Sequence, residues 1–285
     1  MRLFVTGGTG FIGSHFLNLA AHRGHTVVAL RRKGSQPRVP LLKEPHWIEG
    51  DLDATLITDF KDIDCLVHLA SHSANTPYDN LYNCLYWNVL ASTRLLNSAI
   101  SSGVSRFVIA GTCFEYGLSA NDFEFIPPSA PLRPIWTYPI SKAAASEVFM
   151  GLARDHQISL NILRLFQIFG EGEQESRFYP SLCRAALTGQ NFEMSSGEQI
   201  RDFTPVGLAA QQLLDAAESP QASKPQIRIQ NVGTGAPKTL LQFATEVWAT
   251  LGAQGELRPG IRALRPNELK RIAPEVRTEH HLLEL

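Results

Sequence analysis

The sequence predicts an α/β fold, a doubly wound parallel sheet with a smaller C-terminal lobe. Short apolar runs with strand character alternate with helical apolar spacing as far as Gly170, and this alternation is typical of a parallel sheet covered by helices on both faces. The chain has 285 residues, of which 44% are hydrophobic, enough for a sizeable core. Beyond Gly170, proline and glycine interrupt the pattern, so we expect the smaller lobe there.

The elements follow from hydrophobic periodicity and segment length. The expected strands are residues 2–6, 25–31, 47–49, 65–70, 106–110, 160–166 and 226–232. The expected helices are residues 11–23, 80–101, 138–154, 179–188 and 240–251. Because ligands of doubly wound sheets bind at the carboxyl ends of the strands, polar residues that directly follow a strand are candidates for the site.

The composition argues against several functional classes. A net charge of −1 disfavours nucleic acid as the main partner, and no apolar run approaches the length of a membrane span. Met1 leads directly into the first expected strand, so we expect no signal segment and a cytoplasmic protein. The cysteines are far apart and form no CxxC pair, which indicates reduced thiols and no metal site; they are Cys65, Cys84, Cys113 and Cys183.

A glycine-rich turn separates the first strand from the first helix, with Gly7, Gly10 and Gly13 spaced three apart. Glycine lets the backbone come close to a pyrophosphate, and the N-terminus of the following helix directs its amides at the anion. An ordinary turn is the alternative, but the strand before and the helix after favour dinucleotide binding. We expect residues 1–170, with parts of 200–235, to bind the cofactor, and residues 171–200 and 236–285 to form a substrate-binding lobe.

Two further units carry acid–base chemistry. Tyr138 and Lys142 lie four residues apart at the start of an expected helix, and therefore on one face of it. An ammonium near a phenol favours the phenolate and lowers the phenol pKa, which makes Tyr138 a usable acid or base. Thr112 follows the expected strand 106–110 and offers a hydroxyl that can polarise a carbonyl.

Together these units resemble the extended short-chain dehydrogenase/reductase family that acts on nucleotide sugars, the NAD-dependent epimerase/dehydratase family. The match covers residues 2–235. Within the family, residues 111–117, 169–172 and 194–203 are similar to the dTDP-6-deoxy-L-talose 4-dehydrogenase group and related nucleotide-sugar 4-ketoreductases. Further motifs that agree with the family stand at residues 50–52, 65–70, 88–93, 164–170, 201–203 and 231–233.

The resemblance implies a role for each matching residue. Tyr138 is expected to exchange a proton with the sugar oxygen, Lys142 to hold the nicotinamide ribose, and Thr112 to hydrogen-bond the reacting oxygen. The expected cofactor contacts are Gly7, Gly10, Phe11, Ile12, Gly13, Asp51, Leu52, Leu69, Ala70, Tyr138 and Lys142. The expected substrate contacts are Cys113, Phe114, Gln167, Arg177 and Arg201, although Arg177 can equally be structural, as can Asn88 and Arg164.

The first departure from the family concerns the cofactor. NAD-dependent members carry an acidic residue at the end of the second strand for the ribose 2′-hydroxyl, whereas this chain has Arg31 and Arg32. A guanidinium cannot accept a hydrogen bond from a hydroxyl but pairs well with a 2′-phosphate. We therefore expect NADP(H) to be preferred, with NAD(H) still possible; a solvated basic turn is the alternative.

The second departure concerns the reaction. The 4,6-dehydratases of the family place an Asp-Glu pair directly after the hydroxyl residue, where this chain has Cys113 and Phe114. Dehydration then lacks its acid and base, and what remains is reduction of the C4 ketone of a nucleoside-diphosphate 4-keto-6-deoxyhexose. A 4-epimerase with tightly bound NAD and a catalytically silent dinucleotide-binding protein stay open, as do the base and the sugar stereochemistry. The helices 80–101 and 138–154 resemble those through which family members pair, so we expect a homodimer.

Overall fold

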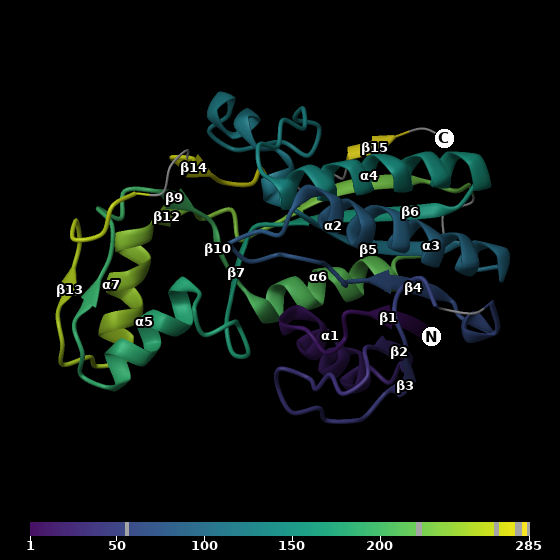
Figure 1. The fold of residues 1–285 in the computed structure, drawn as a ribbon, viewed down its shortest axis with the longest axis horizontal. Helices are drawn as coiled ribbons and strands as arrows, with labels where there is room; N and C mark the ends of the chain where they lie inside the picture. The colour runs from purple at the N-terminus through teal and green to yellow at the C-terminus, as the bar shows by residue number, and fades with distance from the viewer. Residues whose placement is uncertain (55–56, 221–223, 265–267, 277–280, 284–285) are drawn as a thin grey trace.

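The computed structural model describes residues 1–54, 57–220, 224–264, 268–276 and 281–283. A central sheet carries helices on both faces, and a smaller group of helices and short strands projects from one side of it (Figure 1). This is the predicted doubly wound α/β architecture, so the fold class is confirmed. Within the described part of the chain, no helix combines the length and the apolar character needed to cross a membrane.

The central sheet has eight strands in the order β15-β11-β6-β5-β4-β1-β2-β3. Neighbouring strands are parallel, except that β15 runs antiparallel to β11. The strand order reverses between β1 and β4, and such a reversal opens a crevice at the carboxyl ends of the strands. The bounds are β1 Arg2–Thr6, β2 Thr26–Arg31, β3 His46–Glu49, β4 Cys65–His68, β5 Arg106–Thr112, β6 Ser159–Leu165, β11 Ile227–Val232 and β15 His281–Leu283.

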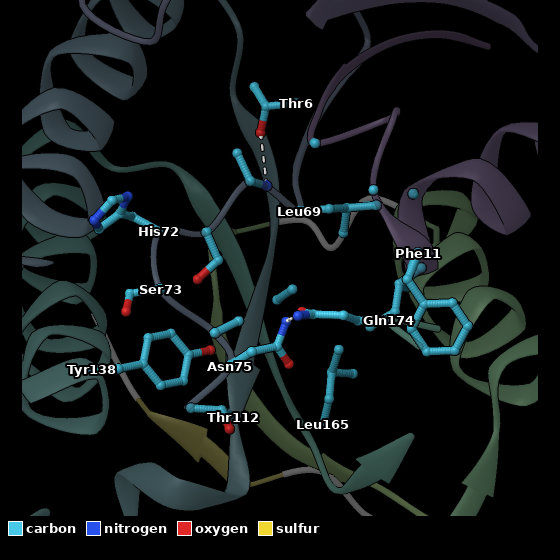
Figure 2. A pocket seen from close by; sticks show the side chains of 18 of the residues that line it. Thr6, Phe11, Leu69, His72, Ser73, Asn75, Thr112, Tyr138, Leu165 and Gln174 are labelled. Atoms are coloured by element: carbon cyan, nitrogen blue, oxygen red, sulfur yellow. Dashed lines mark hydrogen bonds between the residues drawn. The ribbon is translucent and has the colours of Figure 1, made fainter. Parts of the chain in front are cut away.

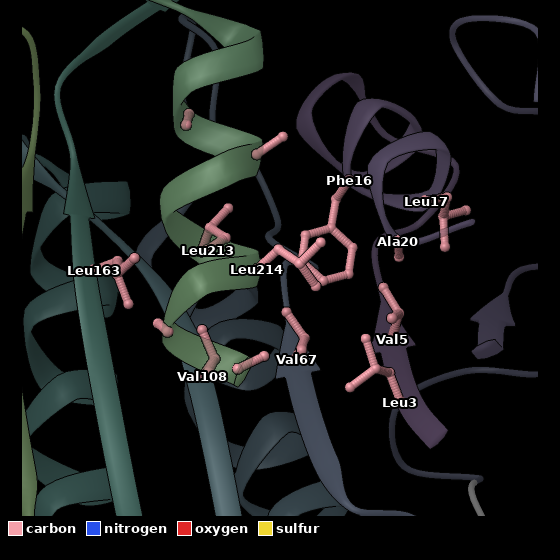
Figure 3. Packing of buried hydrophobic residues seen from close by; sticks show 14 of the residues in the cluster. Leu3, Val5, Phe16, Leu17, Ala20, Val67, Val108, Leu163, Leu213 and Leu214 are labelled. Carbon is pink, nitrogen blue, oxygen red and sulfur yellow. The ribbon is translucent and has the colours of Figure 1, made fainter. Parts of the chain in front are cut away.

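Apolar side chains alternate between the two faces of the sheet, as strand geometry requires. Leu3 and Val5 of β1 join the core on one face, and Phe4 joins the core on the other. On the first face Phe16 of α1 (Phe11–His22) packs beside Leu213 and its neighbours on α6 (Val206–Glu218), over β1, β4, β5 and β6 (Figure 3). The second face is covered by α3 (Ser92–Ser101) and α4 (Thr137–His156). These two layers hold the strands whose ends form the site.

Two helical segments differ from the prediction. The helix expected over 80–101 is divided into α2 (Leu81–Leu85), a π-helical segment (Tyr86–Ala91) and α3. The Ser92 hydroxyl donates to the Trp87 carbonyl five residues earlier, at 2.9 Å, within this wider turn. The prediction also omits α6, although its run of alanine, leucine and glutamine consists of strong helix formers.

The smaller lobe is built on α5 (Phe178–Leu187) and α7 (Leu240–Thr250), with Leu182, Met194 and Ala244 buried between its elements. β7 pairs with β10 where the chain passes from the main sheet to the lobe. The boundaries proposed for the two domains stay a prediction. The remaining strands are β7 Gln167–Phe169, β8 Phe192–Glu193, β9 Ile200–Arg201, β10 Phe203–Pro205, β12 Lys238–Thr239, β13 Leu257–Arg258 and β14 Arg271–Ile272.

Candidate active site

The glycine-rich turn leaves no room for side chains. Gly7 has a φ of +73°, and a Cβ there would lie 2.5 Å from the backbone nitrogen of Ala70. A Cβ on Gly13 would lie 2.0 Å from the carbonyl oxygen of Gly7, which accepts the N–H of Gly10 at 2.9 Å. Because α1 begins directly afterwards at Phe11, the turn is a bare backbone cradle at a helix N-terminus. That arrangement fits the pyrophosphate of a dinucleotide.

A cleft of about 1120 Å³ runs from this turn across the carboxyl ends of the strands. Its walls come from β1, from the loops after β2, β4, β5 and β7, and from the start of α4 (Figure 2). Pockets for one drug-sized ligand span roughly 300–1,000 Å³, so the cleft has room for more than one small molecule. The predicted site residues that line it are Gly7, Gly10, Phe11, Ile12, Gly13, Arg31, Arg32, Asp51, Leu52, Leu69, Ala70, Thr112, Phe114, Tyr138, Gln167 and Arg177.

Thr6 and His68 support the backbone beside the turn. The Thr6 hydroxyl lies 2.8 Å from Nδ1 of His68 and accepts the N–H of Ala70 at 3.3 Å (Figure 2). His68 is buried, and burial lowers its pKa to about 3, with the charge of Lys142 adding to the effect. His68 is therefore a neutral hydrogen-bonding group at neutral pH and not a general base.

Tyr138 stands in the first turn of α4, and its phenol points into the cleft, as does the side chain of Thr112 at the end of β5 (Figure 2). Ser71 hydrogen-bonds the phenol, and the ring of Tyr78 lies 5.4 Å from the Tyr138 ring between centroids. Burial raises the pKa of Tyr138, and the hydrogen bond from Ser71 offsets only part of that effect. The phenol is therefore protonated at neutral pH, which suits a proton donor.

Lys142 lies one turn further along the same helix face, but its ammonium donates to the carbonyl of Ala110 at 2.8 Å. The residue is 3% exposed, and burial lowers its pKa. The spacing of Tyr138 and Lys142 in the sequence predicts that Lys142 lowers the pKa of Tyr138. The structure differs, because burial dominates at the phenol and the ammonium is directed at the end of β5.

Two loops meet across the mouth of the cleft, residues 71–79 after β4 and residues 170–177 after β7. Nη1 of Arg177 donates to Asn75 at 3.1 Å, and Asn75 donates to Gln174. Nε of Arg177 donates to Glu173 at 3.1 Å. The Glu173 side chain is 4% exposed, and burial raises its pKa. Arg177 is therefore both a cleft residue and a structural bridge.

Three arginines line the cleft at and after the carboxyl end of β2. Arg31 pairs with Glu49 at 3.1 Å, and its guanidinium lies 4.9 Å above the ring centre of Trp47. Arg32 and Arg38 are exposed and line the cleft. Arg38 was not among the residues predicted from the sequence, although it belongs to the same basic segment, residues 31–38, as the predicted Arg31 and Arg32. The presence of a third arginine in this segment was the sequence signal that could have identified Arg38.

Two predicted substrate contacts lie outside the cleft. Arg201 donates to the carbonyl of Leu269 at 2.8 Å and pairs with Glu268 at 3.5 Å, because β9 is paired on both sides by β12 and β14. Cys113 is 4% exposed and belongs to a separate apolar cluster. The 3₁₀ turn after β5 directs successive side chains to different sides, so Phe114 reaches the cleft and Cys113 does not.

Asn88 has the structural role that the sequence left open. Its side chain accepts the backbone N–H of His72 at 2.7 Å and donates to Ser141 at 2.9 Å. It therefore ties the loop 71–79 to α4. Arg164 is also buried, paired with Glu115 at 3.0 Å.

Comparison with known proteins agrees with this geometry. The model of the NAD dependent epimerase/dehydratase family matches residues 3–233. The chain belongs to this family. Its members modify nucleotide sugars with NAD(P), so the family named in the sequence analysis is confirmed.

Three relatives illustrate the likeness. The CDP-abequose synthase of Salmonella typhimurium is 28% identical over 274 residues, which cover 94% of this chain and 87% of that protein. The dTDP-6-deoxy-L-talose 4-dehydrogenase (NAD(+)) of Aggregatibacter actinomycetemcomitans is 25% identical over 248 residues, which cover 84% and 87%. The structure of MoeE5 in complex with UDP-glucuronic acid and NAD is 29% identical and superposes with a TM-score of 0.83 over 97% of this chain and 90% of that one.

Proposed function

We propose that this protein reduces the C4 ketone of a nucleoside-diphosphate 4-keto-6-deoxyhexose with NADPH. The observation that carries the proposal is the set of groups beside Tyr138. A protonated phenol and the Thr112 hydroxyl face the cleft, and the position where a dehydratase needs a carboxylate holds the ring of Phe114. The name of one relative, dTDP-6-deoxy-L-talose 4-dehydrogenase, supports the same sugar chemistry, because it refers to redox chemistry at C4 of a 6-deoxysugar nucleotide.

The bound nicotinamide cofactor would supply the hydride to C4. The glycine turn would hold its pyrophosphate, and Leu69 and Ala70 would line the cofactor. Tyr138, which its raised pKa keeps protonated at neutral pH, donates its phenolic proton to the C4 oxygen. Thr112 hydrogen-bonds the same oxygen and so stabilises the negative charge that develops there.

The reaction is tested with NADPH and a panel of 4-keto nucleotide sugars, followed at the absorbance of reduced nicotinamide. We expect oxidation of NADPH with at least one sugar, and in Tyr138→Phe a fall in kcat of about 10²–10⁴-fold with an unchanged Kd for NADPH. Isomerised sugar without net cofactor oxidation would assign a 4-epimerase. Binding of cofactor with no reaction of any sugar would assign a silent dinucleotide-binding protein.

The preference for NADPH rests on the exposed arginines of the cleft. Arg32 and Arg38 offer guanidinium groups to a 2′-phosphate, whereas Arg31 already pairs with Glu49. A charge-assisted hydrogen bond contributes about 1.5–3 kcal/mol, so we expect NADPH to bind at least about tenfold more tightly than NADH.

Titration calorimetry with 2′,5′-ADP and with 5′-AMP, which lacks only the 2′-phosphate, tests this preference without turnover. Arg32→Ala should weaken binding of 2′,5′-ADP selectively. Equal affinity of the wild type for the two nucleotides would refute the preference. A matched loss for both nucleotides in Arg38→Ala would assign Arg38 to the 5′-phosphate that they share instead of the 2′-phosphate.

We also propose a homodimer formed through α2, the π-helical segment and α4. Apolar side chains on these elements are exposed on the isolated chain; they are Leu81, Tyr82, Leu90 and Val148. Exposed apolar side chains gathered on adjacent helices favour association. A monomeric mass by light scattering at micromolar concentration would refute this assembly.

A further inference from the structure

Glu115 is a buried carboxylate for which the proposed reaction has no role. It is 0% exposed and stands in the 3₁₀ turn Cys113–Glu115 that directly follows Thr112. A carboxylate is costly to bury unless it is paired and hydrogen-bonded. The hydrogen-bond partners of Glu115 therefore show which elements hold its carboxylate in place.

Both oxygens of Glu115 are used. Oε1 accepts the backbone N–H of Thr112 at 2.8 Å. Oε2 accepts a hydrogen bond from the Ser146 hydroxyl at 2.9 Å and another from Nε of Arg164 at 3.0 Å. One carboxylate thus joins the carboxyl end of β5, the middle of α4 and the end of β6. The close approach to β5 requires Gly111, where a Cβ would lie 2.8 Å from Oε1 of Glu115.

These contacts set the register between β5 and α4. Tyr138, Lys142 and Ser146 are spaced four residues apart and share one face of α4. Lys142 donates to the Ala110 carbonyl, and one turn later Ser146 donates to Glu115. Two hydrogen-bonded links therefore join the helix to the strand end. The first turn of the same face carries the phenol of Tyr138.

The charge of Glu115 also acts on Lys142. Burial lowers the pKa of Lys142, and the carboxylate opposes this effect. Burial keeps the nearby His68 on β4 uncharged at neutral pH, and it keeps the Cys113 thiol uncharged by raising its pKa to about 12. The phenol of Tyr138 is protonated for the same reason. Arg164 is a cation held on Glu115 itself.

We propose that Glu115 is a positioning residue of the active site, which holds the Thr112 turn against the Tyr138 face of α4 and supplies a buried carboxylate on the helix face that carries Lys142. The inference rests on the proposed catalytic roles of Thr112, Tyr138 and Lys142. Its experiment therefore includes a measurement that needs no turnover. A failure of the proposed reaction then remains distinguishable from a failure of this inference.

The charge is tested by NMR titration of ¹³C-labelled lysine, with the Lys142 signal assigned from its absence in Lys142→Met. In Glu115→Gln we expect the midpoint of Lys142 to fall by about one pH unit, at the lower end of the 1–3 units typical of a nearby opposite charge. The upper-pH limb of kcat/KM should move down by the same amount. An unchanged midpoint in folded Glu115→Gln would overturn the electrostatic role.

Matched variants separate charge from packing. Ser146→Ala removes one hydrogen bond to Glu115 and no charge, so it should keep the wild-type midpoint; an equal shift there would overturn the role of charge. If Glu115→Gln does not fold, Glu115→Gln combined with Arg164→Met removes both charges of the buried pair, and we expect a smaller downward shift, because loss of the Arg164 cation partly offsets loss of the carboxylate.

Glu115→Asp tests positioning. Its charge should retain the midpoint of Lys142, but its shorter side chain cannot reach the Thr112 N–H, so kcat should fall at least about tenfold, the effect of 1.4 kcal/mol. A wild-type kcat in Glu115→Asp would overturn the positioning role. Because Glu115 and Ser146 lie outside the cleft, the Kd for NADPH should be unchanged in Glu115→Asp and in Ser146→Ala.

Discussion

His68 should make the stability of the protein depend on pH between 7 and 5. Burial lowers its pKa from 6.5 to about 3. As the pH falls through 6.5, the unfolded chain binds a proton at this histidine, and the folded chain does not until about pH 3. The contribution of His68 to the free energy of unfolding is therefore complete above pH 6.5 and is lost as the pH falls towards 3. At 1.36 kcal/mol for each pH unit, the step from 6.5 to 5 removes about 2 kcal/mol.

Urea denaturation of the wild type and of His68→Leu at pH 7 and pH 5 measures this effect. The wild type should lose about 2 kcal/mol more than the variant between the two pH values. At pH 7 the variant should itself be less stable by about 1 kcal/mol, since the hydrogen bond to Thr6 is lost. Thr6→Val is the matched control, because it removes the same bond but keeps the buried imidazole and its pH dependence. Equal losses in the wild type and His68→Leu would refute the reasoning.

Three other substitutions test the cradle, the mouth of the cleft and the core. Gly13→Ala should weaken NADPH binding at least tenfold, about 1.4 kcal/mol, because its Cβ would lie 2.0 Å from a carbonyl oxygen of the turn. Gly151→Ala is the matched control, because its Cβ would meet nothing within 4 Å. It should keep the affinity for NADPH and raise the free energy of unfolding by about 1 kcal/mol. Arg177→Met should raise KM for the nucleotide sugar about tenfold or more through a lost charge-assisted hydrogen bond, and an unchanged KM would leave Arg177 a structural role alone. Leu213→Ala should cost about 2–5 kcal/mol in urea denaturation, since Leu213 is 0% exposed, and a loss below 1 kcal/mol would contradict its place in the core.

The sheet was predictable from sequence because parallel strands buried on both faces read as continuous apolar runs. β1, β4 and β5 are such runs, and the glycine turn follows the first of them directly. Local spacing also sufficed for Tyr138 and Lys142, since four residues define one helix face. The parts of the site that lie within one segment, the glycine turn and the Tyr138–Lys142 pair, could therefore be predicted from the sequence.

The remaining site residues depend on contacts between distant segments. Arg201 was expected at the substrate, but the fold brings it to the carbonyl of Leu269. Arg177 meets Asn75 across the mouth of the cleft only because two loops, one after β4 and one after β7, lie opposite each other. Glu115 has the sequence context of an ordinary carboxylate in a turn. No local sequence pattern predicts its buried partners, which are Ser146 on α4 and Arg164 on β6.

The shared face of α4 has a consequence for how this enzyme family can diverge. One residue inserted between Tyr138 and Ser146 would rotate everything downstream by about 100° and shift it by about 1.5 Å. Lys142 or Ser146 would then leave the strand end that it contacts. A point substitution changes one side chain of this helix, whereas a change in its length moves Tyr138 relative to the hydrogen bonds that Lys142 and Ser146 make at the end of β5. We therefore expect insertions and deletions among family members in the exposed loop after β2. The four-residue spacing of positions 138, 142 and 146 should stay constant.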